Sequence, residues 1–295
     1  MGITYGGAKR IGESGTLTLS DSIDGGVVET VTFSTYYKDP VVFVFMTTNN
    51  DIRAAQARVS NVTRNSCNIF FQRDDGLSHS SSEDVSYLVM EKGVHRLAEG
   101  GYVEVGSIET DALFSATGSS LGGANTSETI NLTHQFTNSP SVIHSLNTNN
   151  NEAFMSTLAG SVSTSSFIIR QNRLETSSTV QVEKIAWMAI TTGVFDHYES
   201  EILGNAFSAG TRAINFSNTY STNPDIIVKG ITIDGGDGYF MRGAGNLSTS
   251  SISVFTEEDQ INDSETGHTT EAPVYIAMKS GSIFYEDYRL NGILN

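Results

Sequence analysis

Short apolar runs of strand length recur along the chain and are separated by polar turns. Residues 41–46 read VVFVFM, and residues 185–190 read IAWMAI. Runs that are apolar at every position are typical of strands covered on both faces. The segments between such runs, among them TNND, RDDG, TNNN and DGGDG, are rich in Asn, Asp and Gly, which favour turns. The pattern predicts an all-β chain of antiparallel strands.

One arrangement of residues occurs three times. An aromatic residue precedes a glycine by six positions in YLVMEKG, WMAITTG and YIAMKSG, and these aromatics are Tyr87, Trp187 and Tyr275. A proline lies 47 residues before each of the first two and 51 before the third, and each proline follows an aromatic residue by four positions. These prolines are Pro40, Pro140 and Pro224. Repetition at this spacing predicts three tandem units, 1–98, 99–198 and 199–295.

Each unit is long enough for one antiparallel β-sandwich, for which we predict six strands. Side chains alternate across a strand, so Val85, Tyr87 and Val89 share one face while Leu88 and Met90 share the other. Both faces are apolar, and the core of a sandwich covers only one. The second face therefore predicts that the three units pack on one another, in a pseudo-threefold arrangement. Trp187 is expected to belong to this packing rather than to a ligand platform.

Composition and charge exclude several classes of function. The formal net charge of −16 disfavours nucleic acid and anionic lipid as partners, because both require clustered Lys and Arg. The first residues, MGITYGGAKR, contain no apolar segment of the kind found in signal peptides, and no apolar run is long enough to cross a membrane. We therefore expect no nucleic acid, no membrane insertion and no signal peptide.

Motifs of catalysis and cofactor binding are missing. The sequence has no G-x-S-x-G elbow, no phosphate-binding glycine pattern and no H-x3-H pair, so we expect no enzyme, no cofactor and no metal. The acidic segment EEDQINDSE, residues 257–265, is interpreted as a loop tip in solvent rather than a glycosidase site. Asp234 and Asp237, in DGGDG, leave calcium binding open, although hairpin turns usually explain such strings.

Polar residues stand at corresponding places in the first two units. The turn MTTNND is followed by FFQRDD, and the turn LNTNNN is followed by IIRQNR. Fixed amide, carboxylate and guanidinium groups can each bond two adjacent sugar hydroxyls. The candidate ligand-binding residues are Asn49, Asn50, Asp51, Arg73 and Asp74 in the first unit and Asn149, Asn150, Asn151 and Arg173 in the second.

The order of these features resembles the H-type lectin domain. An aromatic residue four positions before a proline, an Asn/Asp turn, NVT before an apolar strand, an Arg/Asp turn and a final strand such as WMAI resemble that family over most of each unit. The resemblance implies a six-stranded sandwich that forms trimers and binds GalNAc or related sugars near the contacts between subunits. It implies that Asp51, Arg73 and Asp74 contact sugar.

Two hypotheses for function follow. The first is a virion or surface adhesin, of the spike or fibre type, whose lectin-like repeats bind glycans on a host surface. The alternative is a purely structural virion, tail or decoration component that binds no sugar. Both place the protein on a virion or extracellular surface, with surface glycan or other virion or surface-assembly proteins as partners. Both also predict an oligomer.

Overall fold

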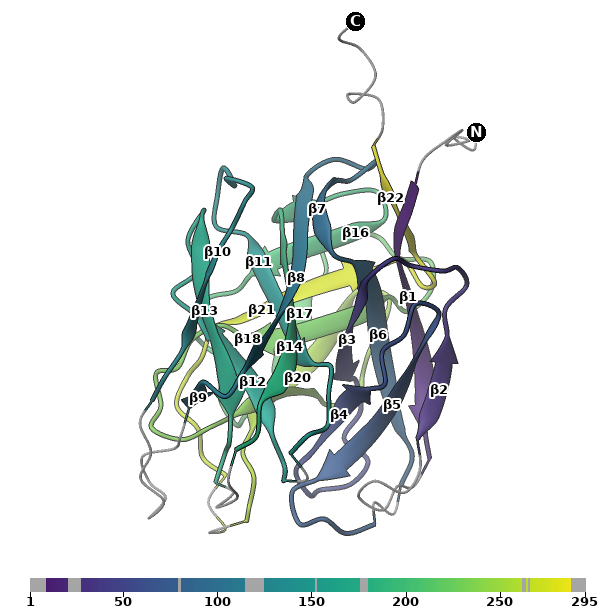
Figure 1. Ribbon diagram of the computed structural model, residues 1–295. Helices are drawn as coiled ribbons and strands as arrows, with labels where there is room; N and C mark the ends of the chain where they lie inside the picture. The colour runs from purple at the N-terminus through teal and green to yellow at the C-terminus, as the bar shows by residue number, and fades with distance from the viewer. Residues whose placement is uncertain are drawn as a thin grey trace, which may run out of the picture.

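The structure, a computed structural model, describes residues 9–20, 28–78, 81–114, 125–151, 153–175, 180–261, 264 and 266–287. Within these residues every regular element is a β-strand, which confirms the predicted all-β class (Figure 1). The strands pair in antiparallel fashion, except that β9 (Leu113–Phe114) runs parallel to β13 (Ser166–Asn172).

Three four-stranded sheets hold the long apolar strands, and each has the same order of elements. The first contains β22 (Ile283–Glu286), β1 (Lys9–Leu19), β6 (Glu83–Glu91) and β3 (Pro40–Met46). The second contains β7 (Gly93–Arg96), β8 (Tyr102–Thr110), β14 (Glu183–Ile190) and β11 (Ser141–Leu146). The third contains β15 (Gly193–Val194), β16 (Tyr198–Ile202), β21 (Pro273–Met278) and β18 (Asp225–Gly230).

The remaining strands form three further sheets, two of three strands and one in which the two-residue strand β9 is the fourth. They are β2 (Glu29–Thr32), β5 (Ser66–Arg73) and β4 (Ala55–Ser60); β10 (Glu128–Asn131), β13 and β12 (Ser156–Gly160), with β9 beside β13; and β17 (Arg212–Asn215), β20 (Ser251–Glu257) and β19 (Phe240–Gly243). Buried apolar side chains join the sheet of β22, β1, β6 and β3 to the sheet of β2, β5 and β4, and the two form a sandwich. Val42, Val44 and Val89 of the first sheet pack with Val59 and Ile69 of the second. Continuous apolar runs thus become strands with two covered faces.

The three repeated aromatic residues occupy the same place in the three four-stranded sheets. Tyr87 lies in β6 opposite Val44 of β3, Trp187 lies in β14 opposite His144 of β11, and Tyr275 lies in β21 opposite Val228 of β18. Trp187 is buried and meets Phe167 edge-on, with ring centroids 5.6 Å apart. Its expected role as a packing residue is supported by this position.

The second face of each central strand packs against the other four-stranded sheets. Leu88 and Met90 share one apolar core with Met188, Ile190 and residues of the third sheet. At the edge of β3 that pairs with no other described strand, the Asn147 amide accepts a hydrogen bond from Val42 N at 2.9 Å and donates one to Val42 O at 2.6 Å. The chain therefore covers its own apolar faces, and an otherwise open sheet edge is capped.

One strand of each four-stranded sheet is supplied from outside the predicted unit. β7 precedes the predicted boundary at residue 98 yet pairs with β8 beyond it, and β15 pairs with β16 in the same way. β22, near the end of the chain, pairs with β1 near its start, so the exchange is cyclic (Figure 1). Gly93 and Gly193 begin β7 and β15 with φ of 136° and 142°, a region that favours glycine.

Candidate functional site

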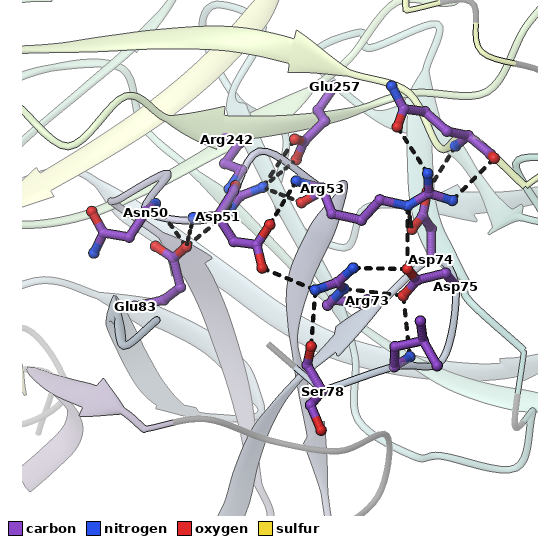
Figure 2. A network of polar contacts seen from close by, with 12 residues as sticks. Asn50, Asp51, Arg53, Arg73, Asp74, Asp75, Ser78, Glu83, Arg242 and Glu257 are labelled. Atoms are coloured by element: carbon purple, nitrogen blue, oxygen red, sulfur yellow. Dashed lines mark hydrogen bonds and ion pairs between the residues drawn. The ribbon is translucent and has the colours of Figure 1, made fainter. Parts of the chain in front are cut away.

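The turn at residues 49–51 is held against the start of β6 by Glu83. This buried carboxylate accepts hydrogen bonds from Asn50 N at 2.8 Å and from Asp51 N at 3.2 Å (Figure 2). It also accepts one from the Thr48 hydroxyl. The Asn50 side chain donates to Ser82 O at 2.6 Å. Asn49 and Asn50 remain exposed to solvent. The carboxylate of Glu83, on the strand that pairs with β3, thus fixes the conformation of the predicted binding turn.

The structure brings Asp51 and Arg73 together. Arg73 Nη1 donates to Asp51 Oδ2 at 2.9 Å and to Ser78 O at 2.8 Å, while Nε and Nη2 bind Asp75 (Figure 2). Asp74 is buried and accepts from Arg53 at 2.5 Å. Burial raises the pKa of Asp74, against the effect of Arg53. These polar side chains therefore bond chiefly to one another.

The second predicted turn has the same construction. Asn151 is buried, and it donates from its backbone to Glu183 at 2.7 Å and from its amide to Gln171 at 3.2 Å. Asn150 donates to Val182 O at 2.6 Å, and Asn149 is exposed. Arg173, half-buried, follows β13, and its backbone N–H donates to Phe114 O at 3.2 Å. Within the described residues, the surface of this turn that faces solvent is formed by Asn149 and Asn150.

Arginines from neighbouring sheets reach the two glutamates. Arg242 of β19 is fully buried and donates to Glu83 at 2.9 Å and to both oxygens of Glu257 at 2.9 and 3.0 Å (Figure 2). Arg58 of β4 makes the corresponding contact with Glu183 at 3.4 Å. Each arginine also donates to backbone carbonyls of the turn that it supports, such as Thr48 O and Asn151 O. Ion pairs at two of the junctions between sheets therefore position both turns.

The third glutamate of this type has a histidine partner instead. Glu271 accepts from Asp234 N at 2.8 Å and from Gly235 N at 3.2 Å, and His268 Nε2 lies 3.0 Å away. His268 Nδ1 also contacts Glu258. Burial lowers the pKa of His268, but the hydrogen bonds to Glu258 and Glu271 outweigh it and raise the pKa to about 9. His268 is therefore a cation at neutral pH.

Stability should depend on this histidine in a defined pH range. Because its folded pKa lies above the ordinary value of about 6.5, its contribution is fully present below that value and is lost as the pH rises through about 9. We expect His268→Gln to lower stability by the order of 3 kcal/mol at pH 6 and by much less at pH 10. Thermal unfolding between pH 6 and 10 measures this, with His197→Gln as control. A loss independent of pH would contradict the ion pair.

The acidic segment of residues 257–265 corrects one prediction. Glu257, Glu258 and Asp259 are buried rather than solvated. They bond Arg242, His268 and the backbone N–H of Glu175, so neighbouring donors compensate the cost of removing these charges from water. Asp263 and Glu265 lie outside the described residues. Across the described residues, no group of three or more His, Cys, Asp or Glu is arranged to hold a metal ion, and Asp234 instead accepts from Asn205.

Two grooves lie where neighbouring sheets meet, beside these turns. The first groove, of about 330 Å³, is lined by Lys38, Asp39, Pro40, Asn61, Val62, Thr63, Arg64, Lys92, Asn147, Thr148 and Lys184. The second groove, of about 750 Å³, is lined by Thr16, Leu17, Thr18, Thr47, Thr48, Asp84, Thr222, Asn223, Pro224, Gly245, Leu247 and Ser280. Both volumes fall in the range of sites for small ligands.

The two grooves share several corresponding positions. Pro40 begins β3 in one, and Pro224 directly precedes β18 in the other. Thr148 and Thr48, which donate to Glu183 and Glu83, form the opposite walls. Asn149 and Asn49 follow these threonines directly, so the exposed part of each predicted turn adjoins a groove. Sequence reasoning found the turns but missed the grooves, because each groove joins residues of two predicted units.

No family model, curated protein or solved structure matches the chain. The described residues include no helix that could span a membrane.

Proposed function

We propose that this protein is a surface attachment protein, of the virion spike or adhesin type, that binds glycans through the grooves between its sheets. The observation that carries the proposal is the pair of corresponding grooves. In the second groove, Thr18, Thr222, Asn223 and Asp84 provide hydroxyl, amide and carboxylate groups beside Leu17 and Leu247. Such a mixture suits a sugar ring, which has polar hydroxyls and apolar C–H faces.

Two corresponding grooves on one chain favour multivalent binding. A single shallow polar groove binds a sugar weakly, but two linked sites raise the overall avidity without any new contact. The exposed turn residues Asn49 and Asn149 directly follow Thr48 and Thr148, which line these grooves. The apolar faces of the long strands are covered by other sheets of the same chain, so they require no outside partner and give no support to the purely structural alternative.

A glycan array, followed by two sets of variants, tests this function. We expect the double variant Thr222→Ala/Asn223→Ala to weaken binding of the best neutral glycan about tenfold, because each lost hydrogen bond costs about 0.5–1.5 kcal/mol. Thr211→Ala, an exposed threonine outside both grooves, should have no effect. Absence of binding to any glycan would support the structural component instead.

The turns are tested separately with Asp51→Ala/Arg73→Ala and Asn49→Ala/Asn149→Ala. The first pair removes an internal ion pair, so circular dichroism and thermal unfolding must accompany the binding measurement. Weaker binding by either folded double variant would place sugar at the turns themselves. Unchanged binding by both, with loss in the groove variant, would restrict the site to the groove.

A further inference from the structure

We propose that the first groove selects anionic saccharides, those bearing a carboxylate or a sulfate ester; this inference rests on the proposed glycan binding. Four cationic side chains line the groove, Lys38, Arg64, Lys92 and Lys184, against a single carboxylate, Asp39. The whole chain has only 17 Lys and Arg and a net charge of −16. On so acidic a protein, this cluster of cations is a local feature that an anionic ligand could recognise.

The existing partners of these cations are weak. Lys92 lies 3.1 Å from Asp39 and Lys184 lies 3.7 Å from Glu109, and both carboxylates are mostly exposed, at 63% and 70%. Exposed pairs of this kind contribute little to stability. Arg64 is held by a hydrogen bond from Nε to Tyr37 O at 3.1 Å, and neither of its Nη groups has a hydrogen bond to a described residue. An anionic group could therefore bind two or more of these cations without breaking a strong contact.

The second groove shows that the fold does not require these charges. Thr222, Ser280 and Asp84 stand where the first groove has Lys38, Lys92 and Lys184, while the prolines and the threonines of the opposite wall are kept. The second groove contains no cation among its lining residues. The two grooves thus share a frame and differ in charge, which predicts two glycan specificities on one chain.

The acidity of the remaining surface restricts the class of ligand. A long polyanion such as nucleic acid would extend beyond the groove over a protein of net charge −16, where repulsion opposes binding. A short glycan with one or two acidic groups places its charge inside the groove and its neutral part outside. The groove therefore fits an acidic oligosaccharide better than an extended polyanion.

The test exchanges the three lysines for the residues of the second groove, Lys38→Thr, Lys92→Ser and Lys184→Asp. The probes are a sulfated oligosaccharide, a sialylated oligosaccharide and their neutral counterparts, measured by titration calorimetry at low and high salt. We expect the triple variant to lose at least tenfold in affinity for the acidic probes and to keep its affinity for the neutral ones. Binding of the acidic probes to the natural protein should weaken as salt increases.

The control variant changes the second groove instead, with Thr222→Ala/Asn223→Ala, and should leave acidic probes unaffected. Binding of sulfated, sialylated or both probes supports the inference and identifies the anionic group. Equal binding of acidic and neutral probes, unchanged in the triple variant, overturns the inference while the proposed function stands. Absence of binding by every probe overturns both. Equally tight binding of a short single-stranded DNA would also overturn the assignment to saccharides.

Discussion

Arg242→Met is expected to destabilise the folded protein by about 3–5 kcal/mol, because it leaves the carboxylates of Glu83 and Glu257 buried without their cation. Arg242 also donates to Thr48 O and Arg53 O, so the turn that adjoins the second groove loses its support. Burial raises the pKa of Glu257 to about 7 even though Arg242 lowers it. In the variant, protonation relieves the buried charge, so the loss should be smaller at pH 5 than at pH 8.

Urea unfolding at both pH values measures this effect, and two further variants serve as controls. Arg58→Met removes the corresponding arginine, which contacts one carboxylate at a longer distance, so its cost should be smaller. Combining Arg242→Met with Glu83→Gln and Glu257→Gln should recover most of the stability, since no charge is then left unpaired. Equal losses in Arg242→Met and Arg58→Met, with no recovery in the triple variant, would show that packing dominates.

Trp187→Ala should cost about 3–5 kcal/mol, the usual range for removing a large buried aromatic side chain. Trp187 is 8% exposed and packs edge-on against Phe167. On the neighbouring strand, its ring lies over Gly106, where an added Cβ atom would come within 2.2 Å of the indole. The cavity left by alanine would therefore be bounded by strands that cannot close around it.

Equilibrium unfolding in urea tests this value, with Tyr36→Ala, a 74% exposed aromatic, as the control for a surface change. Gly106→Ala alone should be destabilising, because the ring cannot move aside, but should be better tolerated in the Trp187→Ala background. This coupling is expected for residues in direct contact. A near-neutral Trp187→Ala variant that fails to bind glycan would instead make Trp187 a ligand residue.

The local pattern of residues was sufficient to predict that the chain is built from β-strands. Two continuous apolar runs, residues 41–46 and 185–190, lie in strands β3 and β14 of the four-stranded sheets. Both strands are covered on both faces, as runs of this kind predict. Tyr87, Trp187 and Tyr275 occupy corresponding positions because each lies at a fixed distance from a proline and a glycine. The second apolar face of these strands packs against other sheets of the same chain.

The candidate turns show the limit of such reasoning. The structure brings Asp51 and Arg73 together, yet their charges are directed largely toward each other and toward Asp75. A polar residue in a turn carries the same signal whether it binds a ligand or its own chain. Glu83 and Arg242 are distant in sequence from the turn at residues 49–51. Only their positions in the folded protein show which polar groups of the turn are bonded internally and which are open to solvent.

The sequence by itself determined the all-β class, the repeated pattern and the positions of the polar turns, because these depend on spacing and on alternation along one strand. The tertiary structure decided which strand pairs with which sheet edge. Every open edge offers the same backbone hydrogen bonds, so only packing selects one edge over another. It also decided the content of the grooves. Lys38 and Lys184 line the same groove only when β3 and β14 pack together, and only then do their charges belong to one cationic cluster.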